Sequence, residues 1–130
     1  MDVFQDATLN QKKSIGNFFV LLSLCDGNFS PLKFGYMDAF ISTWGLTIND
    51  CTSYLKVTNK NVMYSDLTSL SRIQKEALVM SSFELAYCDK EANEKELNFI
   101  IDIFDIIGIN EDELANILKK MRLIKLGLLI

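Results

Sequence analysis

The chain of 130 residues contains no histidine, and it has little proline or glycine. The missing histidine removes the most common general base, the usual base of a nucleophile triad and the most common nitrogen ligand for metals. This absence is the strongest argument in the sequence against an enzyme. The single proline and six glycines also argue against long irregular segments.

Cysteine content, charge and hydropathy exclude further classes of protein. The three cysteines, Cys25, Cys51 and Cys88, form no CxxC pair, so we expect neither a disulfide framework nor a structural zinc site. The net charge of −4 does not favour binding to nucleic acid. No apolar run approaches the about 20 residues of a membrane span, and the first residues lack the pattern of a signal peptide. We therefore expect a cytoplasmic protein without a transmembrane segment.

A repeat with an offset of 63 residues is the most informative pattern in the chain. The Cys-Asp dipeptides that begin at Cys25 and Cys88 are separated by this offset, and Gly45 and Gly108 are too. Apolar positions also pair at this offset, without a gap, over residues 18–57 and 81–120. A repeated helical hairpin predicts two pseudo-symmetric halves.

Helix signals predict a compact all-α bundle of about six to seven helices in a single domain, residues 1–130. Apolar spacing of three and four residues, bounded by glycines and cap residues, predicts helices near residues 10–25, 31–44, 69–88 and 94–107, and others that begin near 49 and 111. Residues 58–68 have the weakest helical pattern and predict a connection between the halves, with up to one helical turn. Because the helices near 31–44 and 94–107 are apolar over most of their circumference, we expect them to form the central pair.

The two turns resemble those of the TerB-like domain family. In that family the turn commonly reads A-D-G-x-x-x-x-x-E. Here it reads C-D-G-N-F-S-P-L-K from Cys25 and C-D-K-E-A-N-E-K-E from Cys88, so only the first keeps the glycine and only the second keeps the glutamate. The resemblance covers most of the chain in layout. It implies an all-helical module of two pseudo-symmetric halves that is associated with tellurite resistance and related bacterial stress systems.

The same resemblance implies that acidic residues of the turns are metal ligands, here Asp26, Asp89 and Glu96. The motif is split between the halves, and Glu96 also fits the second position of a capping box that Asn93 begins. No nucleotide-binding motif occurs, so no cofactor is expected other than a divalent cation. Two functions stay open: a non-enzymatic scaffold or interaction protein of bacterial stress response, or an acidic metal-binding protein for ion sequestration or metal-dependent hydrolysis.

The C-terminal segment is the candidate partner-binding region, because it mixes basic residues with leucine and isoleucine. A basic amphipathic helix can lie on a membrane or on a partner, or it can close the core of its own domain. The residues assigned to partner binding are Leu126, Leu128, Leu129 and Ile130. A second copy of the chain is the simplest partner, which would give a homodimer.

Overall fold

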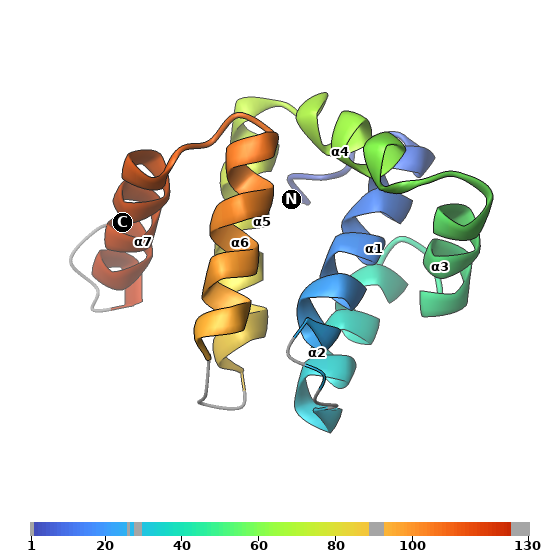
Figure 1. Cartoon of the computed structure of the whole chain (residues 1–130), viewed down its shortest axis with the longest axis horizontal. Helices are drawn as coiled ribbons and strands as arrows, with labels where there is room; N and C mark the ends of the chain where they lie inside the picture. Colours follow the sequence, from blue (N-terminus) through green and yellow to red (C-terminus); the bar gives the residue numbers. More distant parts are fainter. Residues whose placement is uncertain (1, 26, 28–29, 89–92, 126–130) are drawn as a thin grey trace.

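The computed structural model of the chain describes residues 2–25, 27, 30–88 and 93–125, with side chains to residue 122 in the last helix. Seven α-helices make up this part of the chain (Figure 1). The helices are α1 (Leu9–Leu24), α2 (Pro31–Ser42), α3 (Ile48–Val57), α4 (Lys60–Thr68), α5 (Arg72–Tyr87), α6 (Glu94–Ile106) and α7 (Glu111–Lys125). No β-strand occurs in the described ranges. The predicted all-α class and number of helices are confirmed.

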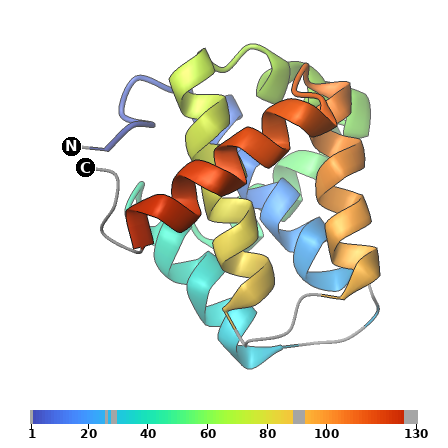
Figure 2. The same ribbon diagram turned by 90° about the vertical axis from the view of Figure 1, so that its left-hand side faces the viewer.

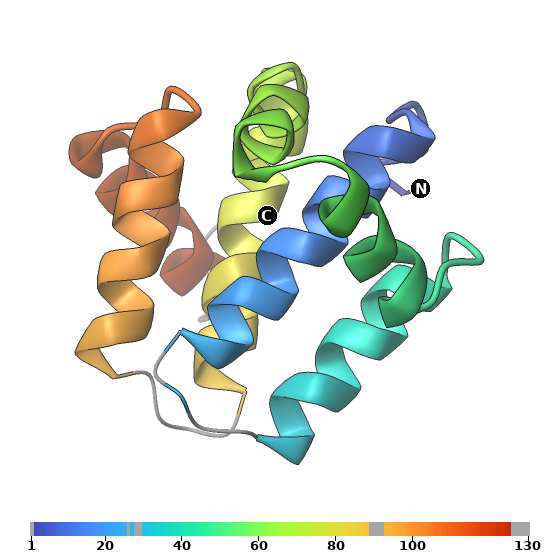
Figure 3. The same ribbon diagram turned by 45° about the vertical axis from the view of Figure 1, so that its right-hand side comes forward.

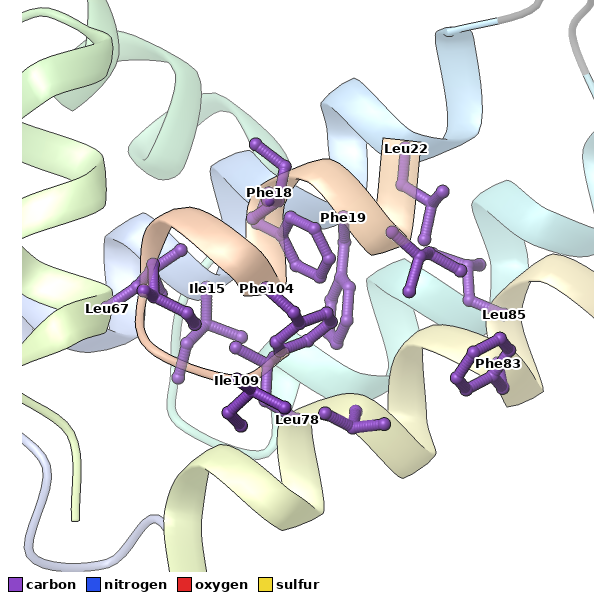
Figure 4. Packing of buried hydrophobic residues seen from close by; sticks show 14 of the residues in the cluster. Ile15, Phe18, Phe19, Leu22, Leu67, Leu78, Phe83, Leu85, Phe104 and Ile109 are labelled. Atoms are coloured by element: carbon purple, nitrogen blue, oxygen red, sulfur yellow. The ribbon is translucent and has the colours of Figure 1, made fainter. Parts of the chain in front are cut away.

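Helix α1 is central and is surrounded by other helices (Figure 3). Its residues 14–19 are all buried, and six consecutive buried positions cover the whole circumference of a helix. Phe18 packs edge-on against Phe104 of α6, with ring centroids 5.6 Å apart. Figure 4 shows these rings together with Leu78 of α5 and other apolar side chains in one continuous cluster. The core therefore forms where α1 meets α5 and α6.

The prediction that helices near 31–44 and 94–107 form the central pair is wrong. Helix α2 buries only Lys33, Met37 and Ile41, which are spaced by four residues and make one stripe. Leu32 on the same helix is 63% exposed. The central position of α1 was not predicted, because small and polar residues such as Ser14 and Gly16 stand at several of its buried positions.

Residues 58–68 are not a simple connection, because most of them form α4. Asn59 caps this helix and accepts a hydrogen bond from the backbone N–H of Val62. Met63 and Leu67 are buried and bring α4 against α1. The helical pattern was weak because only these few apolar residues point inward.

The first residues of the helices repeat at the 63-residue offset. The paired first residues are Leu9 and Arg72, Pro31 and Glu94, and Ile48 and Glu111. Contacts repeat as well, because α1 contacts α6 while α5 contacts α2. Gly45 and Gly108 both have positive φ, at 73° and 99°, just past the ends of α2 and α6, as the sequence predicted.

A two-fold relation in space between the halves stays a prediction. It would be tested by superposing the backbone of residues 18–57 on that of 81–120. We expect a deviation below about 4 Å, a tolerance set by the helical pitch of ~5.4 Å. A larger deviation would contradict the repeat as a spatial feature.

Candidate functional site: the acidic turns and the C-terminal apolar surface

Glu96 is the only predicted metal ligand that the structure describes, since Asp26 and Asp89 lie outside the described residues. Its Oε2 accepts a hydrogen bond from Nζ of Lys33 at 2.5 Å, within an ion pair. Its Oε1 accepts one from the backbone N–H of Asn93 at 3.4 Å, in the predicted capping box. Each carboxylate oxygen therefore accepts a hydrogen bond, and a cation held by this carboxylate would lie next to the ammonium group of Lys33.

The Lys33–Glu96 ion pair is buried on both sides, with side chains only 6% and 2% exposed. The two residues occupy equivalent positions of the repeat, the third residue of α2 and of α6. Sequence analysis did not anticipate this pair, although opposite charges at equivalent positions were a usable signal. A buried pair is costly to break, because the remaining charge stays in an apolar interior. We therefore assign it to fold specificity rather than to catalysis.

In the first half, α3 packs tightly against α1. A β-carbon placed on Gly16 would lie 2.3 Å from the sulfur of Cys51, so a larger residue at this position would force Cys51 to shift. Burial raises the pKa of the Cys51 thiol to about 11, which keeps it protonated at neutral pH and unreactive. Ser14 of α1 and Tyr54 of α3 both donate to Oδ2 of Asp66 in α4, at 2.7 and 2.8 Å. These contacts hold α3 and α4 against α1.

In the second half, α7 is the equivalent of α3, and larger residues stand at the equivalent positions. Gly16 corresponds to Val79 and Cys51 to Leu114, and both of these are buried. Two larger side chains need more room between the helices than glycine and cysteine do. Figure 2 shows α7 crossing α5, with α6 beside it. Ion pairing of Arg72 with Glu113 joins the starts of α5 and α7 and lowers the pKa of the Glu113 carboxyl.

A hollow of about 290 Å³ opens between α5, α6 and α7. It is lined by Phe83 and Tyr87 of α5, Leu97 and Ile101 of α6, and Leu118 of α7, and we call these five residues the C-terminal apolar surface. Tyr87 is 50% exposed and Leu118 is 37% exposed. A second hollow of about 510 Å³ shares Phe83, Tyr87 and Leu118 and extends toward the end of α7. Exposed apolar groups that line a concave surface are typical of binding sites.

The first half has a smaller counterpart of this hollow. It has a volume of about 210 Å³ and lies between α1, α2 and the start of α3. Three of its lining residues, Val20, Leu24 and Phe34, are the repeat equivalents of Phe83, Tyr87 and Leu97. Both halves therefore place apolar side chains around equivalent hollows, and the hollow of the second half is larger.

The residues assigned to partner binding from the sequence, Leu126, Leu128, Leu129 and Ile130, lie outside the described residues. They directly follow α7, which contributes Leu118 to the C-terminal apolar surface. The sequence pattern pointed to this segment and not to the C-terminal apolar surface that precedes it. Leu118 belongs to the apolar pattern of α7 together with Leu114, Ile117 and Met121, and the pattern alone does not show that Leu118 is the exposed member.

The described residues contain no group of three or more His, Cys, Asp or Glu side chains that could hold a metal ion. None of the helices in this part of the chain is long and apolar enough to cross a membrane. Comparison of the chain with protein-family models, with curated proteins and with solved structures gave no match.

Proposed function

We propose that this protein is a non-enzymatic, TerB-like helical module that acts by binding another protein chain, as a scaffold or interaction protein of bacterial stress response. The observation that carries the proposal is the C-terminal apolar surface, where aromatic and aliphatic side chains from three helices line an open hollow. The resemblance in the turns supports the link to the TerB-like family and to tellurite resistance. The lack of histidine supports a role without catalysis.

A pull-down from extracts of the cells in which the gene occurs tests this proposal. The bait would be the wild-type chain, the variant Leu118→Glu, and a truncation that lacks residues 128–130. We expect a specific partner with the wild-type bait and much less of it with both variants, because a charge or a shorter apolar segment weakens an apolar contact. Both variants should keep the thermal melting transition of the wild type.

The matched control is Val57→Glu, which also places a charge at an exposed apolar residue but at the end of α3, in the other half. This variant should capture the partner as well as the wild type does. The proposal would be wrong if no protein depended on Leu118, or if the control lost binding to the same extent.

A titration distinguishes the proposed function from the alternative, which is metal binding through Asp26, Asp89 and Glu96. Calorimetry with Ca²⁺, Mg²⁺ and Mn²⁺ should show no saturable binding, because Glu96 is committed to Lys33. Saturable binding that Glu96→Gln abolishes, in a protein that stays folded, would instead support sequestration or metal-dependent hydrolysis.

A further inference from the structure

Helix α7 carries a stripe of four residues that is complementary to the same stripe of a second copy running in the opposite direction. Glu111, Ala115, Leu118 and Arg122 are spaced by four, three and four residues, so they lie along one face of the helix. All four are exposed. The stripe is roughly 16 Å long at about 1.5 Å per residue. It begins with an acid, ends with a base and has two apolar residues in the middle.

The order of these residues fits a second copy of the same stripe that runs in the opposite direction. A two-fold axis between Ala115 and Leu118 places Glu111 opposite Arg122 of the second copy, and Ala115 opposite its Leu118. The reversed pairs follow from the symmetry, since an isologous interface repeats every contact. Neither Glu111 nor Arg122 forms an ion pair with another residue in the described part of the chain. Their charges are thus available to a partner.

The surroundings of the stripe favour the same occupant. Glu111, Ala115 and Leu118 line the hollow of about 290 Å³, while Leu118 and Arg122 line the neighbouring hollow of about 510 Å³. The stripe therefore runs along the edge of the C-terminal apolar surface. A second α7 laid against it would place its own Leu118 against Ala115, which lines the hollow together with Tyr87 and Leu97. The small side chain of Ala115 allows the two helices to approach closely.

We propose that the chain forms a symmetric dimer through antiparallel packing of α7 against α7 of a second copy. The contact is apolar at Ala115 and Leu118 and is flanked by the two Glu111–Arg122 ion pairs between copies. This inference rests on the proposed function, because it identifies the partner of the C-terminal apolar surface. The inferred dimer differs from the scaffold function in that it requires only a second copy of this chain and no other protein.

Charge reversal of the full-length chain tests the antiparallel register. In sedimentation equilibrium over a concentration series, we expect a monomer–dimer equilibrium for the wild type. Leu118→Glu, Glu111→Arg and Arg122→Glu should each shift the protein to monomer, because each places an unpaired or like charge in the contact. The double variant Glu111→Arg/Arg122→Glu restores opposite charges across the interface and should recover the dimer.

The controls carry the same charge changes in the first half. Asp38→Arg in α2 and Lys56→Glu in α3 alter exposed residues and should leave the equilibrium unchanged. Thermal melts show whether each variant is folded. A dimer that persists in Leu118→Glu, or a double variant that stays monomeric although folded, would overturn the proposed interface.

The experiment also separates this inference from the proposed function. A wild-type chain that is monomeric at every concentration, but that captures another protein through Leu118, would overturn the dimer and leave the interaction function standing. A monomer that captures nothing through Leu118 would overturn both.

Discussion

The two halves of this protein have the same order of helices, but their third helices pack differently. In the first half, α3 lies close to α1 because Gly16 leaves room for Cys51. In the second half, Val79 and Leu114 occupy the equivalent positions, and a larger apolar hollow opens beside α7. The comparison shows that different residues at two equivalent positions accompany a close helix contact in one half and a larger apolar hollow in the other.

Breaking the ion pair between Lys33 and Glu96 should have the largest effect on stability. Lys33→Met leaves the Glu96 carboxylate buried without its cation, and we expect a loss of about 3–5 kcal/mol in the free energy of unfolding. The double variant Lys33→Met/Glu96→Met removes both charges and should lose much less than the single variant. Urea denaturation measures both values. Equal losses in the single and the double variant would contradict the role assigned to the pair.

A methyl group at the α1–α3 contact should give the next largest effect. Gly16→Ala places a β-carbon against the sulfur of Cys51, and such overpacking costs about 1–3 kcal/mol. Replacing glycine by alanine within a helix gains up to about 1 kcal/mol in propensity, so we expect a net loss. Adding Cys51→Ala removes the sulfur and should recover part of the lost free energy of unfolding. A stabilised Gly16→Ala variant would show that the first half is not closed by this contact.

The two glycines that end α2 and α6 should behave alike. Gly45→Ala and Gly108→Ala should each cost about 1 kcal/mol in denaturant unfolding, because a β-carbon is disfavoured at positive φ. Gly35 is the control, since it lies within α2 and has open space where a β-carbon would stand. Gly35→Ala should be neutral or stabilising. Denaturation midpoints that are unchanged at both Gly45 and Gly108 would argue against equivalent turns.

The sequence was sufficient to predict most of the fold, because local signals determine where these helices begin and end. Asn93 with Glu96, and Gly45 with Gly108, stand at the predicted boundaries. The sequence was not sufficient to predict which helices are central. Burial depends on packing between distant segments, and α1 is buried at Gly16 through its contact with Cys51, a residue 35 positions away.

The candidate site was only partly predictable, for the same physical reason. Sequence analysis placed a partner contact at the end of the chain but not on Tyr87 and Leu97, since these residues meet Leu118 only when three helices pack together. The ion pair of Glu96 with Lys33 was not predicted, because it joins residues 63 positions apart. A local pattern describes a residue's neighbours along the chain and not its neighbours in space.

Amide NMR spectra over a protein concentration series test most directly the claim that the second half forms the contact with a second copy and the first half does not. We expect concentration-dependent shifts along residues 111–122 and around Tyr87, Leu97 and Ile101. The equivalent positions Leu24, Phe34 and residues 48–57 should not change. Shifts in the first half that match those in the second, or no concentration dependence in residues 111–122, would contradict the account.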